Sequence, residues 1–238
     1  MMEFYAQTFK IRESECDYTS RARLSALWDI FQTVAVEHAD RLGFGYEKMR
    51  EQGVFWVLSR MDAAISRYPK SGETVRAVTR PVGVSRVFAM REYHIFDAEN
   101  NELTGAVSAW LVVDAETGRP RRPDAKLGGH PIFSVEYGGE VPQKLPELPN
   151  ASYARDFHAE FCDVDINRHV NNSRYVNWAE NLIVPRLGEK RISRICVNYL
   201  HETKMGEKLA AYEERSGYVT ALELRNADGK PVFRADMR

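Results

Sequence analysis

The residues best suited to chemistry lie in one short segment, 163–172, which reads DVDINRHVNN. Within it, Asp165, Asn167 and His169 place a carboxylate, a carboxamide and an imidazole at alternate positions. Such groups can orient a base, bind a polarised oxygen and move a proton near neutral pH. A strand-like stretch precedes the segment and an amphipathic stretch follows it. We therefore predict a reactive site where a strand meets a helix.

The bulk composition is that of an ordinary globular protein. The chain has 238 residues, of which 44% are apolar and 28% charged, and its formal net charge is −1. A charge this close to zero disfavours a nucleic-acid binder that depends on global charge. No apolar run reaches the roughly 18–20 residues that span a bilayer, and the N-terminal residues lack the features of a secretory signal. We expect a cytoplasmic protein without a membrane span.

The cysteines do not indicate a disulfide framework or a zinc site. Cys16, Cys162 and Cys196 are odd in number and lack C-x-x-C spacing. His158 and Glu160 alternate with Cys162 as on one face of a strand, a pattern that can mimic a metal site, but no second cluster accompanies them. We expect no metal and no cofactor.

The chain repeats one pattern twice. Segments 58–77 and 192–211 align without a gap at an offset of 134 positions, with Gly72 on Gly206. Each segment reads as a strand, a turn and a second strand. Upstream, the sequence around position 16 resembles that around position 162, which indicates an offset of 146 there and a longer helical segment in the first copy.

Both copies predict a helix laid on an antiparallel meander. Apolar residues at three- and four-residue spacing run from Leu24 to Leu42, with Ser20 as a plausible N-cap and Gly43 as a stop. The second helix lies within 172–187. Predicted strands are 7–15, 55–67, 74–84, 85–96 and 104–114 in the first copy, and 192–200, 208–215, 218–226 and 232–237 in the second. One helix on a curved antiparallel sheet is an α+β architecture.

The repeat sets the predicted domain boundaries. Residues 1–125 form the first domain and 151–238 the second, each of a workable size. Between them, 126–150 is rich in proline and glycine and includes the run PQKLPELPN. We interpret this segment as an extended linker.

A longer motif around the reactive segment carries a family resemblance. Residues 165–178 match D-x-N-x-H-V-N-N-x-x-Y-x-x-W, with eight fixed positions in fourteen. The chain thereby resembles the acyl-ACP thioesterases of bacteria and plant plastids, which contain two tandem hotdog domains. The family also has a glutamate about 33 residues after the histidine, a place that Glu202 fits. Plant members commonly carry a cysteine after that glutamate, whereas this chain has Thr203.

The resemblance implies hydrolysis of acyl-ACP thioesters with release of free fatty acid, which terminates fatty acid synthesis. The sequence contains no G-x-S-x-G elbow, so we favour direct attack by water. His169 or Glu202 would then remove the water proton, Asp165 would fix the imidazole, and Asn167 would bind the thioester oxygen or the water. A helix N-terminus would add N–H groups. Attack by Glu202 itself, through an anhydride, stays open.

The first copy lacks the acid–base set. At the offset of 146, Arg21 stands opposite Asn167 and Arg23 opposite His169. We expect this copy to be non-catalytic and to form the acyl-chain pocket, whose length would set the chain-length preference. The predicted lining residues are Trp28, Phe31, Val34, Phe55, Trp56, Val57 and Met61.

The implied partner is acyl carrier protein, which is generally acidic. The densest basic run contains Arg119, Arg121 and Arg122 and is a candidate contact for it; a solvated connector is the alternative. Rival functions are an acyl-CoA thioesterase, a hotdog dehydratase and a non-catalytic acyl-thioester binding protein. Two tandem hotdogs can make within one chain the pairing that single hotdogs make as dimers, so monomer and homodimer both stay open.

Overall fold

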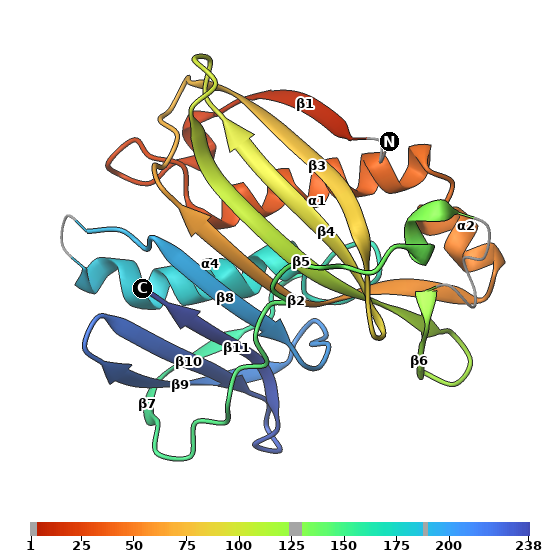
Figure 1. Ribbon diagram of the computed structural model, residues 1–238. Coiled ribbons are helices and arrows are strands. Elements are labelled where there is room, and N and C mark those ends of the chain that lie inside the picture. Colours follow the sequence, from red (N-terminus) through yellow and green to blue (C-terminus); the bar gives the residue numbers. More distant parts are fainter. Residues whose placement is uncertain (1–3, 124–129, 188–189) are drawn as a thin grey trace.

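A computed structural model describes residues 4–123, 130–187 and 190–238 of the chain. Within these ranges, eleven strands form one antiparallel sheet that lies across two long helices (Figure 1). The helices are α1 (Leu24–Arg41) and α4 (Asn172–Ile183), which contact each other. The strands are β1 (Tyr5–Lys10), β2 (Val54–Ile65), β3 (Thr74–Ser85), β4 (Phe88–Phe96), β5 (Glu102–Asp114), β6 (Pro120–Arg121), β7 (Ser152–His158), β8 (Arg194–Tyr199), β9 (Lys208–Ser216), β10 (Val219–Arg225) and β11 (Pro231–Met237).

The two halves join through β2 and β8 at the centre of the sheet. In the antiparallel register Arg60 pairs with Asn198, Asp62 with Cys196 and Ala64 with Arg194. At an offset of 134, Cys196 is the equivalent of Asp62, so this pairing is symmetric about that pair. A pseudo-twofold axis therefore passes between the two strands, and the predicted repeat at this offset is confirmed.

The loop that leads into each helix follows a different offset from the one predicted. A 3-10 turn precedes the loop at Glu13–Glu15 in the first half and at Phe161–Asp163 in the second. Later in the loop, Ser20 and Arg168 adopt left-handed φ angles of 61° and 64°. Isolated bridges pair residue 16 with 22 and residue 164 with 170. All three features recur at 148 positions, so the predicted offset of 146 is wrong.

The start of α1 differs from the prediction for the same reason. Ser20 lies in the turn of the loop, and the N-cap residue of α1 is Arg23. Its equivalent at an offset of 148 is Asn171, the N-cap of α4. The end of α1 at Arg41, just before Gly43, agrees with the predicted stop.

The apolar residues divide between two main clusters. The larger cluster packs α1 and α4 against both halves of the sheet. A smaller one gathers around Phe44, Met49 and Phe133, beside the short helix α2 (Tyr46–Glu51). Throughout the described ranges, no helix combines the length and apolar character needed to cross a bilayer.

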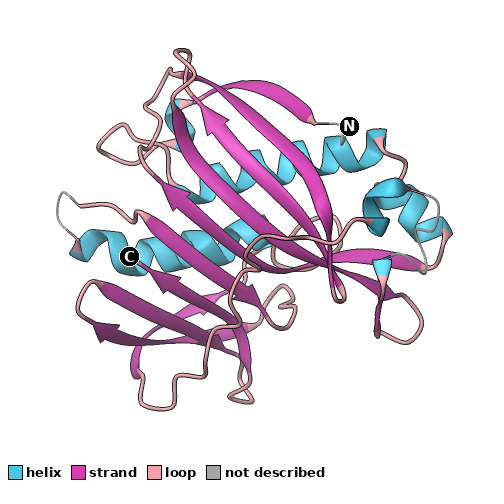
Figure 2. Cartoon of the chain, in the orientation of Figure 1, coloured by secondary structure: helices cyan, strands magenta, loops and turns pink. Residues whose placement is uncertain are grey.

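The described part of the predicted linker is packed rather than free (Figure 2). Residues 130–150 pass along the sheet. The N–H of Val84 on β3 donates to the carbonyl of Val135, and the N–H of Tyr137 donates to the carbonyl of Val84, both at 2.8 Å. Further along, Leu145 and Leu148 are buried. The predicted domains, 1–125 and 151–238, enclose β1–β6 and β7–β11.

Candidate active site

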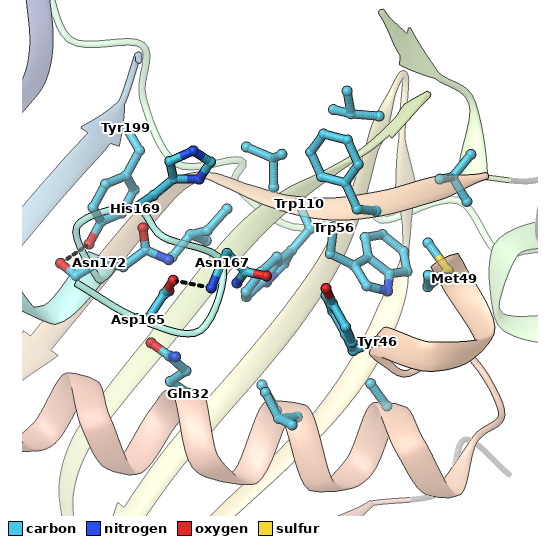
Figure 3. Close-up of a pocket in the computed structure, with 18 of the residues that line it drawn as sticks. Gln32, Tyr46, Met49, Trp56, Trp110, Asp165, Asn167, His169, Asn172 and Tyr199 are labelled. Atoms are coloured by element: carbon cyan, nitrogen blue, oxygen red, sulfur yellow. Dashed lines mark hydrogen bonds between the residues drawn. The ribbon is translucent and has the colours of Figure 1, made fainter. Parts of the chain in front are cut away.

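A large cavity opens beside the loop that joins β7 to α4. Its volume is about 970 Å³, near the upper end of the usual range for small-molecule sites. The four predicted catalytic residues, Asp165, Asn167, His169 and Glu202, all line it. Figure 3 shows the first three of them on the loop. The folded chain therefore brings together groups that are 37 positions apart in the sequence.

The imidazole of His169 and the carboxylate of Glu202 are in contact at this cavity. The Nε2 atom of His169 lies 2.7 Å from Oε2 of Glu202. An isolated bridge between His169 and Lys204, and the hydrogen bond from the N–H of Val170 to the carbonyl of Thr203 at 2.8 Å, hold the two backbones side by side. The side chains are 34% and 63% exposed, respectively. The pair thus lies where solvent and cavity meet.

The described hydrogen bonds of Asp165 lie within the loop, whereas the prediction assigned this residue to the orientation of the His169 imidazole. Its Oδ1 accepts the N–H of Asn167 at 2.8 Å, and its backbone carbonyl accepts the N–H of Arg168 at 2.9 Å. Its own N–H donates to the carbonyl of His169 at 2.9 Å. These bonds close a tight turn of the Asx type. Among the described residues, Glu202 supplies the carboxylate that contacts the imidazole.

The N-terminus of α4 borders the same cavity. Asn171 caps the helix, because its Oδ1 accepts the N–H of Ser173 at 2.9 Å. Asn172 lines the cavity, and its carbonyl accepts a hydrogen bond from the Tyr199 hydroxyl at 3.1 Å. Nearby, Asn167 extends from the loop towards the cavity (Figure 3). Polar hydrogen-bonding groups therefore gather at one end.

Three of the seven predicted pocket residues line the cavity. Phe55, Trp56 and Val57 lie on consecutive positions of β2. The indole N–H of Trp56 donates to the carbonyl of Phe44 at 2.9 Å, which fixes the ring beside the cavity. These residues come from the N-terminal half, as predicted.

The other four, Trp28, Phe31, Val34 and Met61, are buried in the main core and do not line this cavity. The helical period explains the difference. The face of α1 that carries the bulky residues packs against the sheet, whereas the cavity is bordered by the adjacent face, with Gln32, Ala35, Val36 and Ala39. Bulk and apolarity on α1 therefore mark the core.

Sequence reasoning missed the wall at the other end of the cavity. Met49 and Tyr46 on α2, together with Phe133 from the predicted linker and Trp110 on β5, line it. Phe133 packs against Phe44, which also lines the cavity, with ring centroids 5.3 Å apart. The one signal available was an apolar pair, Ile132 and Phe133, inside a segment otherwise read as linker.

Comparison with known proteins identifies the family. The models of the acyl-ACP thioesterase N-terminal and C-terminal domains match residues 2–125 and 147–237. The chain belongs to the acyl-ACP thioesterase family. A chloroplastic palmitoyl-acyl carrier protein thioesterase of Gossypium hirsutum is 28% identical over 213 residues, which are 83% of this chain and 52% of that protein. The chain spans about half to three fifths of the length of such relatives.

Two solved structures share the whole fold of this chain. An acyl-ACP thioesterase from Bacteroides thetaiotaomicron superposes with a TM-score of 0.86 at 24% identity, covering 98% of this chain and 96% of that one. A putative oleoyl thioesterase from Lactobacillus plantarum gives 0.79 at 26% identity, covering 99% and 95%. The α+β double-hotdog architecture expected from the sequence is confirmed.

The three cysteines take no part in the candidate active site. None of Cys16, Cys162 and Cys196 lines the cavity, and burial raises the pKa of the Cys196 thiol to about 12. Thr203, which follows Glu202, is fully buried. Among the described residues, no group of three or more His, Cys, Asp or Glu side chains is arranged to hold a metal ion.

The three candidate carrier-protein contacts lie on the surface around β6. Arg119, Arg121 and Arg122 are all exposed. Arg121 also pairs with Asp114, with Nη2 and Oδ2 3.2 Å apart. Bonds from Thr117, then from Arg121, lower the pKa of Asp114 to about 2, so this carboxylate stays charged near neutral pH. Contact with a carrier protein stays a prediction for this surface.

A buried arginine side chain borders the same cavity. Arg91 on β4 lines it and is 7% exposed. Its Nη1 lies 3.2 Å from Nδ1 of His38 and 3.3 Å from Oγ1 of Thr79. Burial, together with the charges of Arg91 and Arg41, lowers the pKa of His38 to about 4. His38 is therefore neutral at pH 7 and can accept from the guanidinium.

Proposed function

We propose that the chain hydrolyses acyl-ACP thioesters and releases free fatty acid, the step that terminates fatty acid synthesis. One observation carries the proposal: the His169–Glu202 pair, 2.7 Å apart, stands at the polar end of a cavity of about 970 Å³ with an extended apolar wall. Membership of the acyl-ACP thioesterase family supports the same substrate class.

The cavity suits an acyl chain with its thioester held at the loop. Aromatic and aliphatic side chains form the walls away from the loop, including Trp56, Trp110 and Phe133. Burial of each methylene there contributes about 0.8 kcal/mol. The thioester carbonyl then lies among Asn167, His169 and the N-terminus of α4, where N–H groups can stabilise developing negative charge.

The chemical step is attack of water on the thioester carbon. The His169–Glu202 pair takes the water proton as the C–O bond forms. Because Nε2 of His169 is engaged by Glu202, the imidazole can accept a new proton only at Nδ1, and Glu202 can accept one at its second oxygen. The C–S bond then breaks, and the same pair returns the proton to the departing thiolate. The products are a fatty acid and the carrier thiol.

Asp165 and Asn167 support this step in different ways. Asp165 holds the loop in its turn through the N–H of Asn167, so we assign it a positioning role. The Asn167 carboxamide borders the cavity and can donate to the carbonyl oxygen or hold the water. Removing one such donor typically costs about 100- to 1,000-fold in kcat.

The acyl carrier protein would dock at the exposed end of the site, with the basic residues around β6 as a candidate contact. We also propose a cytoplasmic location, on the sequence alone. Because β2 and β8 join the two halves within one chain, a monomer suffices for this arrangement.

Thiol release from a panel of acyl-ACP substrates tests the function. Wild type should release thiol, and His169→Ala should lose at least about 100-fold in kcat. The same acyl chains presented as acyl-CoA distinguish a carrier-protein enzyme from a CoA enzyme. Tight binding of acyl-ACP without thiol release would overturn the proposal in favour of a binding protein.

A further inference from the structure

Because the two halves are related by the pseudo-twofold axis, a side chain from α4 lies at the N-terminus of α1, and the equivalent side chain from α1 lies near the N-terminus of α4. In the N-terminal half that side chain is Glu180 on α4. Its Oε1 accepts the N–H of Leu24 at 2.8 Å, and its Oε2 accepts the N–H of Ser25 at 3.4 Å. A carboxylate therefore occupies the start of α1, where N–H groups lack acceptors within the helix.

The same relationship in the C-terminal half brings Gln32 to the start of α4. At the offset of 148, Gln32 is the equivalent of Glu180, and Asn172 is the equivalent of Leu24. Gln32 and Asn172 both line the cavity. In Figure 3 the Gln32 side chain rises from α1 towards the loop that carries Asp165. Among the described contacts, neither the Gln32 carboxamide nor the Asn172 N–H has a hydrogen-bond partner.

The N-terminal copy of the site is filled. Thr19, Arg21 and Tyr68 stand where the C-terminal copy has Asn167, His169 and Glu202. The Tyr68 hydroxyl donates to the carbonyl of Ile192 at 2.8 Å and is buried.

The Arg191 guanidinium, from the C-terminal half, contacts the loop of the N-terminal copy. The Nη2 atom of Arg191 lies 3.2 Å from Oδ2 of Asp17 and 3.0 Å from Oγ1 of Thr19. In this closed copy, Glu180 supplies the oxygen that the helix N-terminus requires.

We propose that Gln32 is a further catalytic residue of the thioesterase site, which contacts the thioester carbonyl oxygen. The carbonyl oxygen of the thioester accepts the N–H of Asn172, just as a Glu180 oxygen accepts the N–H of Leu24 in the other half. The Gln32 carboxamide donates a second hydrogen bond to the same thioester oxygen. A neutral donor is required here because a carboxylate would compete for the Asn172 N–H and repel the oxyanion. This inference rests on the proposed hydrolase function.

Changing Gln32 to glutamate tests this role. Q32E should recreate the closed arrangement of the N-terminal half and lower kcat/KM more than about 100-fold at pH 8. Burial raises the pKa of Glu180 to about 6, although the N–H groups of Leu24 and Ser25 act against this rise. A glutamate at 32 would face the equivalent helix N-terminus, so its charge should be lost progressively as pH falls, and the ratio of Q32E to wild-type activity should rise from pH 8 to pH 5.5.

Other ionisable groups border the same cavity, so only the ratio of variant to wild type at each pH is informative. These groups are Asp165, Arg168 and His169 on the loop, His201 and Glu202 after β8, Arg91 on β4, Arg50 and Tyr46 on α2, Tyr175 on α4 and Tyr199 on β8. Q32M removes the donor without adding charge and should lower kcat about 10- to 100-fold at every pH. Glu180→Gln, the change at the equivalent position of the closed copy, should leave kcat unchanged.

A second readout does not require turnover. An acyl-ACP analogue in which an amide replaces the thioester keeps the carbonyl oxygen, and Q32E should bind it at least tenfold more weakly at pH 8 than at pH 5.5 relative to wild type. Full activity of Q32M, or a ratio for Q32E that does not change with pH, would overturn the role of Gln32 alone. Absence of thiol release by wild type from every acyl thioester would instead remove the proposed function, and this role with it.

Discussion

The indole N–H of Trp28 donates to the hydroxyl of Tyr199 at 3.1 Å. That hydroxyl in turn donates to the carbonyl of Asn172, also at 3.1 Å. A residue that the sequence suggested for the acyl pocket is thus part of a hydrogen-bonded chain that links α1, β8 and the first residue of α4. The chain positions the helix N-terminus that borders the site.

Replacing Tyr199 with phenylalanine should weaken both the fold and the site. The change leaves the buried indole N–H of Trp28 without its acceptor, which costs about 1–3 kcal/mol, and removes the Tyr199 hydroxyl from the Asn172 carbonyl. We expect a loss of that size in the free energy of unfolding by urea titration. We also expect a several-fold fall in kcat, because the start of α4 loses a tether. Tyr212→Phe on β9 is the matched control, since no hydrogen bond of its hydroxyl is among the described contacts.

The His169–Glu202 pair should act as a unit. Their 2.7 Å contact predicts that His169→Ala and Glu202→Gln each lower kcat by about 100- to 10,000-fold. The double variant should lose little more than the worse single variant, because groups that act together are not additive. Steady-state kinetics on one acyl-ACP substrate would measure this. Glu207→Gln, on the same surface turn, is the control. Additive losses would show that the two residues act in separate steps.

The sequence predicted well those features that depend on an ungapped match between the two copies. The offset of 134 followed from an ungapped match, and the register of Asp62 with Cys196 agrees with it. The predicted offset for the loop was wrong because it aligned Cys16 with Cys162 and did not align the two turns. The feature that both loops share is an Asp whose side chain accepts the N–H of the residue two positions later, as Asp17 accepts that of Thr19 at 2.7 Å.

The cavity wall was harder to predict for a different reason. Helix α2 is six residues long, too short to show a helical period, and Phe133 lies in a segment whose prolines indicated a linker. On α1 the largest apolar residues pack in the core, while the cavity is bordered by small ones such as Ala35 and Ala39. Residue type alone does not separate a core face from a ligand face.

Ala39 offers a direct test of the chain-length hypothesis. It lies seven residues beyond Gln32 on α1 and so about 10 Å further along the cavity. Ala39→Phe should fill that region and move the products towards shorter fatty acids. Gas chromatography of the acids released from a mixture of acyl-ACPs would measure the shift. Thr33→Phe, exposed on the same helix, should not change the profile. An unchanged profile for Ala39→Phe would place the acyl chain elsewhere.

His38 should make the stability of the fold depend on pH. Burial and the charges of Arg91 and Arg41 lower its pKa to about 4 from an ordinary value of 6.5. Between these values the unfolded chain binds a proton that the folded chain does not, so this residue destabilises the fold as pH falls from about 6.5 towards 4. The slope is about 1.4 kcal/mol per pH unit for one proton. His38→Gln should remove that part of the slope, whereas His158→Gln, on the exposed end of β7, should leave it. Equal slopes for wild type and His38→Gln in urea titrations from pH 4.5 to 6.5 would mean that His38 takes up its proton in the folded protein, and that Arg91 then tolerates a second buried charge 3.2 Å away.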